Sequence, residues 1–337
     1  MAYTTIDDPT DYFNTILYAG TGSSQSISVG FQTDWTWIKD RDSTENHNIF
    51  DTIRTATKRI SSNRSNAEDT QAQQLTAFGS NGFTVGTDSG ANHSGRNYTS
   101  WNWLAGGSAS SNTNGSINSS VSVNTTAGFS ICSWTHDGGN STIGHGLGAI
   151  PQVVITKERN AVGSWNSYFS GIGNAHRIVL QGTNAKISSS LWNSTTPTAN
   201  VFSMNDSITS NMIAYCFTEK KGYSKFGTYT GNGNADGSYI HLGFRPAFTI
   251  LKKSSSSGNR WVINDSKRSP SNVVNKSLFA DFNSADSTTS QEIDYLSNGF
   301  KLRTTSSNHN TSGHTYIYMA FAESPFTNSN GVPCNAR

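Results

Sequence analysis

The residues of this chain that could carry chemistry form a few small groups, and the first is a repeated acid–base pair. Asp51 and Arg54 stand in IFDTIR, and Asp265 and Arg268 stand in INDSKR with the same spacing. Each pair comes just after an apolar stretch typical of a strand. We expect a local ion pair that closes a turn. A role as a ligand contact is the alternative, because an exposed pair would add little stability.

Two glycine-rich stretches, HDGGNS with Asp137 and GNGNADG with Asp236, resemble parts of a calcium loop. Calcium takes about six to eight oxygen ligands, usually from several carboxylates, and each stretch offers one. His145, in GHGLG, has no second histidine at ligand spacing, and we expect it in a turn or at the surface. The sequence therefore predicts hairpin turns, without a metal site or a cofactor.

The carboxylates do not suggest an enzyme. Glycoside hydrolysis needs two carboxyl groups that face each other across a cleft. The glutamates are scattered, and none stands beside an aspartate at a repeated position. The G-x-S-x-G and P-loop motifs do not occur. The sequence thus predicts a protein without catalytic residues.

Four tryptophans are candidates for contact with a receptor or a glycan. An indole ring has an apolar face and a polar edge, which suits it to binding surfaces. Repetition within the sequence does not tie these four to a core position, so they are candidates for an exposed aromatic platform, with burial in a core as the alternative. The four residues are Trp101, Trp165, Trp192 and Trp261.

A threefold internal repeat must position all of these groups, and repeats of this kind decide the architecture. Each of three lysines has a glycine nine residues before it and a large apolar residue two before it, and each copy continues to an Asn-x-Phe motif. The first and third copies share further residues at an offset of 218. The lysines are Lys39, Lys157 and Lys252, after the glycines Gly30, Gly148 and Gly243 and the apolar residues Trp37, Ile155 and Ile250.

The pattern within each copy is that of strands. Trp35 and Trp37 alternate with Thr36 and Ile38 at a period of two. We therefore predict an all-β protein of three imperfect β-sandwich repeats, of jelly-roll or concanavalin-like type, with Trp37 and its counterparts buried. Residues 17–40, 133–158 and 226–253 each read as a hairpin. One short helix is possible over residues 66–78.

The predicted divisions follow from the repeat and from composition. A stretch rich in Gly, Ser and Asn reads as a flexible linker, although SINSSVSV within it could add an edge strand. The divisions are an N-terminal arm (1–11), repeat one (12–104), the linker (105–127), repeat two (128–219), repeat three (223–323) and a C-terminal tail (324–337).

Composition excludes several classes of protein. Charged residues make up 14% of the chain against roughly 25% in an average domain, and the formal net charge is only +2. No basic cluster is interleaved with aromatics, so nucleic acid is not an expected partner. No apolar run is long enough to span a membrane, and a secretory signal is not expected. We expect Cys132 and Cys216 to be buried free thiols.

The chain resembles virion proteins of marine tailed bacteriophages, those that infect cyanobacteria and SAR11-like bacteria. The motifs that carry the resemblance run in order from Phe13 to Phe326. They are GFQTDWTWIK, SNGFTVG, NYTSWNW, NTTAGFSI, GHGLGAIP, IAYCFTE, GYSKFGTYTGNG, GFRPAFTILK, LSNGFKLR and TYIYMAFAESPF. Thr33 stands where the repeat pattern has proline, which affects one turn. The resemblance implies a tail-fibre-like structural protein of the particle and supplies no catalytic residues.

The expected function is therefore that of a virion surface protein that is assembled in the host cytoplasm and contributes to host attachment on the tail or its fibres. A capsid decoration or head-fibre protein is one alternative, and a carbohydrate-binding module or polysaccharide depolymerase is another. Expected partners are other virion proteins, a bacterial surface receptor or glycan, and further copies of the chain, as a trimer in particular. The terminal segments match nothing in the repeat, and we expect neighbouring subunits to hold them.

Overall fold

The computed structural model describes residues 2–288 and 291–334 and has an all-β fold, with 46% of residues in strands and 2% in helices. The predicted fold class is thus confirmed at the level of all-β. Its two short helices are η1 (Pro9–Asp11) and α1 (Ser89–Asn92). Within the described part of the chain, no helix has the length and the apolar character needed to cross a membrane.

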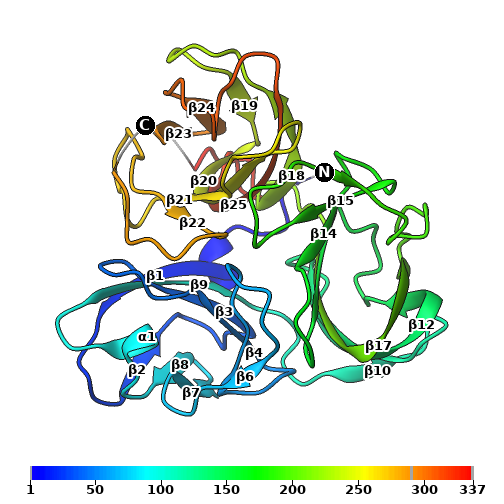
Figure 1. Cartoon of the computed structure of the whole chain (residues 1–337). Helices are drawn as coiled ribbons and strands as arrows, with labels where there is room; N and C mark the ends of the chain where they lie inside the picture. Colours follow the sequence, from blue (N-terminus) through cyan, green and yellow to red (C-terminus); the bar gives the residue numbers. More distant parts are fainter. Residues whose placement is uncertain (1, 289–290, 335–337) are drawn as a thin grey trace.

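Three large antiparallel sheets form the body of the molecule, and Figure 1 shows them as three lobes around a common centre. The first sheet has the order β1 (Phe13–Ala19), β9 (Asn97–Trp103), β3 (Trp35–Asp40), β4 (Asn48–Asp51). The second sheet has the order β10 (Ser110–Asn112), β11 (Ser119–Asn124), β12 (Phe129–Gly144), β17 (Val201–Phe217), β13 (Val153–Glu158), β14 (Asn166–Phe169), β15 (His176–Val179), β16 (Ile187–Ser188). The third sheet has the order β18 (Ser224–Thr230), β25 (Thr315–Pro325), β20 (Phe244–Lys253), β21 (Val262–Asp265), β22 (Leu278–Phe279).

Smaller sheets accompany the first and third sheets. The first small sheet has the order β2 (Gln25–Ser28), β8 (Gly82–Val85), β7 (Leu75–Gly79), and β5 (Lys58–Arg59) pairs with β6 (Asp69–Thr70). The second small sheet has the order β19 (Tyr239–His241), β24 (Gly299–Leu302), β23 (Ile293–Leu296). Each three-stranded small sheet shares an apolar core with the large sheet that it accompanies.

The three predicted hairpins are wrong, because another strand lies between the two strands of each. β9 separates β1 from β3, β17 separates β12 from β13, and β25 separates β18 from β20. In the first and third sheets, the chain between the two outer strands leaves to form β2 or β19 in the small sheet. The last strand of that part of the chain, β9 in the first sheet and β25 in the third, lies between the two strands instead.

Two local predictions also fail. Residues 66–78 contain β6 and most of β7 instead of a helix, because Leu75 is buried in the core beneath β8 and tertiary packing overrides helix propensity. The predicted linker, 105–127, holds β10 and β11, and β11 pairs with β12 along five residues. Val121 in β11 is buried, so this stretch is part of the second sheet. The alternative that SINSSVSV adds a strand is correct, although β11 lies between β10 and β12 and not at the edge.

The period-two pattern places alternate side chains of the central strands in different cores. Trp35 and Trp37 of β3 point into a central core that all three large sheets share, whereas Ile38 points into the core beneath the first small sheet. In β20, Ile250 points to the central core and Leu251 to the other side. In β13, Ile155 likewise lies in the central core and Val154 in a separate core. The central strands of each large sheet therefore have a core on both faces, and the predicted burial of Trp37, Ile155 and Ile250 is confirmed.

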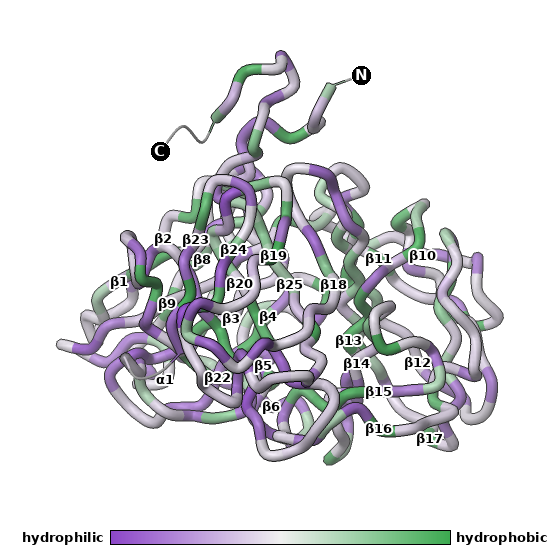
Figure 2. The backbone as a smooth tube through the Cα atoms, turned by 90° about the horizontal axis from the view of Figure 1, so that it is seen from above, coloured by the Kyte–Doolittle hydropathy of each residue, from purple (hydrophilic) through white to green (hydrophobic). Residues whose placement is uncertain are grey.

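The two ends of the chain leave the body side by side, as Figure 2 shows. Asp7 accepts hydrogen bonds from the backbone N–H and the hydroxyl of Ser329, at 2.7 and 2.6 Å. The Tyr3 hydroxyl donates to the carbonyl of Gly243 at 2.6 Å. Contacts within the chain thus join Asp7 near the N-terminus to Ser329 near the C-terminus, and Tyr3 to the body of the molecule.

Candidate functional site

The four candidate tryptophans are all buried, with 0 to 2% of their surface exposed. The prediction that they form an exposed platform is wrong for each of them. Trp192 packs in the core of the second sheet, and the other three lie in the central core. The residues in question are Trp101, Trp165, Trp192 and Trp261.

Ring N–H groups join the large sheets in a cyclic order. Trp165, just before β14, donates to the carbonyl of Ser61 beside the first sheet at 2.9 Å. Trp261, just before β21, donates to the carbonyl of Val179 in the second sheet at 3.0 Å. At the corresponding place before β4 stands His47, whose Nε2 lies 3.2 Å from the carbonyl of Phe282 after β22. Each sheet therefore bonds to the next one around the centre.

The tautomer of His47 follows from its other neighbour. Trp37 Nε1 donates to His47 Nδ1 at 2.7 Å, so the proton of the neutral ring is on Nε2 and is donated to Phe282. Burial lowers the pKa of His47 well below its usual value, which keeps the ring neutral. In the first sheet, Trp37 and His47 together thus make the contact with the neighbouring sheet that a single tryptophan makes in each of the other two sheets.

The repeated acid–base pairs are local ion pairs, as predicted, and they are fully buried. Arg54 Nε lies 2.5 Å from Asp51 Oδ2, and Arg268 Nε lies 2.6 Å from Asp265 Oδ2. Each backbone N–H of these arginines also donates to the partner aspartate. Burial removes the option of a surface ligand contact.

The same aspartates also accept bonds from a neighbouring large sheet. The Tyr215 hydroxyl in β17 donates to Asp51 Oδ2 at 2.7 Å, and Trp101 Nε1 in β9 donates to Asp265 Oδ2 at 3.0 Å. These bonds run from the second sheet to the first and from the first sheet to the third, in the same cyclic order as the ring N–H bonds.

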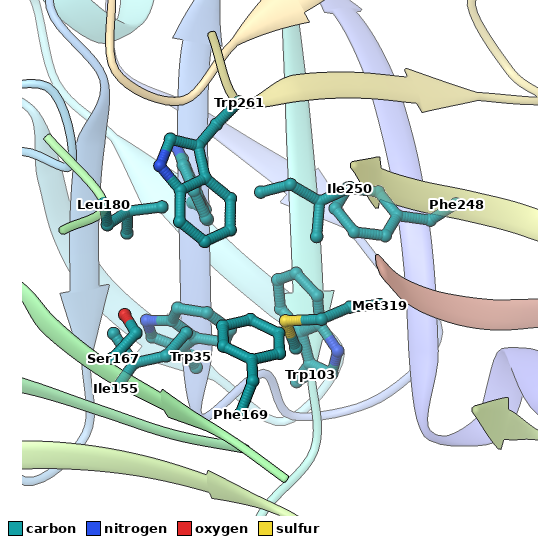
Figure 3. A pocket seen from close by; sticks show the side chains of 11 residues that line it. Trp35, Trp103, Ile155, Ser167, Phe169, Leu180, Phe248, Ile250, Trp261 and Met319 are labelled. Carbon is teal, nitrogen blue, oxygen red and sulfur yellow. The ribbon is translucent and has the colours of Figure 1, made fainter. Parts of the chain in front are cut away.

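The second sheet has an apolar pair where the other two have a hydrogen-bonded one. By strand register, Phe169 takes the place of Asp51 and Asp265, and Met319 the place of Trp101 and Tyr215. Both line a central cavity of about 20 Å³, and Figure 3 shows the Met319 side chain directed towards the Phe169 ring. Because this cavity has room for about one water-sized probe, it cannot hold a saccharide.

A carboxylate bridges two arginines at two of these junctions, and sequence reasoning missed both carboxylates. Glu68 lies 3.3 Å from Arg54 and 3.0 Å from Arg159 of the second sheet. Asp286 lies 2.7 Å from Arg268 and 2.8 Å from Arg41 after β3. Glu68 and Asp286 are 218 residues apart, the offset that other repeated residues share, so the repeat itself could have revealed them.

The three repeated lysines are buried at the ends of their strands and donate to backbone carbonyls. Lys39 Nζ bonds the carbonyls of Asp40 and Ser43, Lys157 Nζ that of Glu158, and Lys252 Nζ that of Asn259. Burial lowers the pKa of each lysine to about 8. The ammonium groups act here as structural donors.

Because the pKa values of these three lysines are lowered, we expect the protein to become more stable between pH 8 and 10. The folded pKa of about 8 lies below the unfolded value of roughly 10.4. Between the two values the unfolded chain binds more protons, so the unfolding free energy rises with pH. Above about pH 10 the buried tyrosines reverse the slope, because burial raises the pKa of Tyr223 and Tyr295.

Urea unfolding at half-unit pH intervals measures this effect. Lys252→Met should flatten the rise relative to wild type, whereas Lys58→Met should leave it unchanged, since Lys58 lies on the short β5 and bonds Thr70 at the surface. A free energy that falls from pH 8 to 10 would contradict the assignment.

The remaining predicted sites have structural roles. His145 is buried, where we had expected a turn or surface position. Its Nδ1 accepts from the backbone N–H of Leu147 at 3.2 Å, and its Nε2 lies 3.1 Å from the carbonyl of Thr198. Asp137 begins a β-bulge inside β12 instead of a hairpin turn. Asp236 is exposed and lies 2.8 Å from Lys301 Nζ.

The described residues contain no group of three or more His, Cys, Asp or Glu side chains that could hold a metal ion. Cys132 and Cys216 are buried free thiols, as predicted.

Comparison with known proteins gives one finding. A family model described as a domain of unknown function (DUF7483) matches residues 8–325, which is nearly the whole chain. No curated protein matches the sequence.

Proposed function

The chain belongs to the DUF7483 family, and we propose that it is a structural protein of a bacteriophage virion, exposed on the tail or its fibres, that contributes to attachment to the host. The observation that carries this proposal is the location of the charged and aromatic side chains that recur in the sequence. The recurring lysines and Asp–Arg pairs are buried, and the two aspartates together with the buried tryptophans join the large sheets to one another. The chain is thus a rigid scaffold, and its polar loops are left for recognition.

The finer part of the proposal is that the scaffold consists of three copies of one β-sandwich unit of jelly-roll type. The first and third units are supported bond by bond. Asn92 Oδ1 accepts from the N–H of Thr21, and Asn310 Oδ1 accepts from the N–H of Asn232, both at 2.8 Å. Tyrosine rings stack beside each asparagine, Tyr18 on Tyr98 and Tyr229 on Tyr316.

The second unit is supported by the strand order and by the glycines before the third strand. Gly30, Gly148 and Gly243 all have positive φ, of 106°, 65° and 82°, a backbone conformation that favours glycine. In this proposal the units occupy residues 12–104, 128–219 and 223–323, and the cyclic contacts at the centre relate them to one another.

The paired ends of the chain supply a route of attachment to the particle. They project from one side of the body (Figure 2), and apolar side chains are exposed there at Phe326 and Val332. We propose that these paired ends bind other virion proteins. The outer loops of the body would then face away from the particle.

Immunogold electron microscopy of intact virions tests the function. An antibody against the purified chain is expected to label the tail or its fibres. Label on the capsid would favour a decoration or head-fibre protein instead. Particles without label, in a preparation where the antibody detects the chain in an infected-cell lysate, would overturn the virion assignment.

A further inference from the structure

We propose that a groove on the third unit binds a glycan, with Tyr239 as the aromatic ring on which a sugar stacks. This inference rests on the proposed role in host attachment and names the ligand class and the site. The groove has a volume of about 530 Å³. It is lined by Arg245, Pro270, Ser271, Asn272, Tyr295, Leu296, Ser297 and Asn298.

The ring of Tyr239 is exposed but held in place. It is 44% exposed, and its hydroxyl donates to Asn298 Oδ1, which belongs to the groove, at 2.6 Å. A Cβ on Gly299 would come within 3.1 Å of Tyr239 Cε2, so the ring lies across the backbone of this turn. The turn therefore supports one side of the ring, and the exposed part can receive a ligand at a low cost in conformational entropy.

The walls of the groove are fixed by hydrogen bonds. The Asn272 side chain accepts from the backbone N–H of Tyr295 at 2.9 Å and donates to its carbonyl at 3.0 Å. Arg245 donates from Nε to Glu323 at 2.9 Å and from Nη1 to the same Tyr295 carbonyl at 3.0 Å. Arg245 also lines the groove, and a guanidinium donates to ligand hydroxyl and carboxylate oxygens.

The internal repeat separates this site from the scaffold. Both small sheets end in the same Ser-Asn-Gly-Phe turn, and the register aligns Tyr239 with Ser26 and His241 with Ser28. Arg245 likewise follows Gly243 at the distance at which Gln32 follows Gly30. The first unit is built without the aromatic ring and the guanidinium, so the strand arrangement that the two units share does not require them.

The chemistry of the groove favours a glycan over a peptide or an apolar ligand. Its lining combines serine, asparagine and arginine side chains with Pro270, Leu296 and Tyr295. The polar groups match a ligand with many hydroxyl groups, and an exposed ring beside them adds an apolar contact for a sugar face.

The test uses the full chain on an array of bacterial O-antigen and capsular polysaccharides, followed by biolayer interferometry on the polysaccharides retained. Wild type should bind at least one of them. Tyr239→Ala should weaken that binding at least tenfold, and Tyr239→Phe, which keeps the ring, at most threefold. Ser26→Ala, at the matching position of the first unit, should leave the affinity unchanged.

Two results would overturn the site, namely binding that Tyr239→Ala does not weaken and the absence of binding to every polysaccharide on the array. Because Tyr239 is on the surface, its replacement should leave the melting temperature within about 2 °C of wild type, which excludes unfolding as the cause of a loss. The virion labelling experiment is independent. Labelled virions without glycan binding would refute this site alone, whereas glycan binding without labelled virions would refute the virion function alone.

Discussion

Replacement of Asp51 by alanine is expected to lower the unfolding free energy by about 3–5 kcal/mol, because it leaves a buried guanidinium without its main partner. Arg54 and Asp51 are both fully buried, and Asp51 also accepts the Tyr215 hydroxyl from the second sheet. The single change therefore disturbs an ion pair and a bond between two sheets. Urea denaturation, monitored by tryptophan fluorescence, measures the loss.

The double variant Asp51→Ala/Arg54→Met separates the two contributions. It removes the unpaired charge, so it should lose less stability than Asp51→Ala alone. Asp265→Ala is the matched variant in the third sheet, where Arg268 and Trp101 are the partners, and should behave alike. A double variant that is less stable than the single one would show that the penalty does not arise from the buried charge.

Replacement of Trp37 by alanine should also cost about 3–5 kcal/mol, the range for removing a buried large aromatic side chain. Trp37 is 3% exposed in the central core, with the Trp101 ring 5.7 Å away between centroids. The change would also take away the hydrogen bond that fixes the tautomer of His47. The loss thus reaches two of the contacts that join the first and third sheets.

Equilibrium unfolding in urea tests this prediction too. Val162→Ala is the control, since Val162 is 71% exposed, and should change the free energy by no more than about 0.5 kcal/mol. A loss below about 1 kcal/mol for Trp37→Ala would mean that the core closes over the missing ring, contrary to the packing described here.

Both predictions concern the centre of the molecule, where three junctions join the large sheets. Two of its junctions use an aspartate that accepts from a tyrosine or a tryptophan, and the third uses phenylalanine and methionine. An aspartate at the place of Phe169 would face Met319 and lack a donor, and an unsatisfied buried carboxylate is costly. The two residues of each pair must therefore change together.

The sequence by itself determined the all-β class, the positions of most central strands, the burial of Trp37 and the local Asp–Arg pairs. Each of these depends on neighbours within a few residues or on a spacing that recurs. An alternation of period two reports that a strand has two faces, and three residues between an acid and a base bring them together in a turn. The offset of 218 also contained the correspondence of Glu68 with Asp286.

Only the tertiary structure decided the strand order, the burial of the four tryptophans and the partners across sheets. The central strands of each large sheet have a core on both faces, so the alternation could not tell which face meets which core. The last strand of each sheet pairs between two earlier ones through contacts that are distant in sequence, and no local spacing encodes them. The supported and exposed ring of Tyr239 was likewise revealed only by the tertiary structure, because the turn beneath it comes from residues about sixty positions later in the chain.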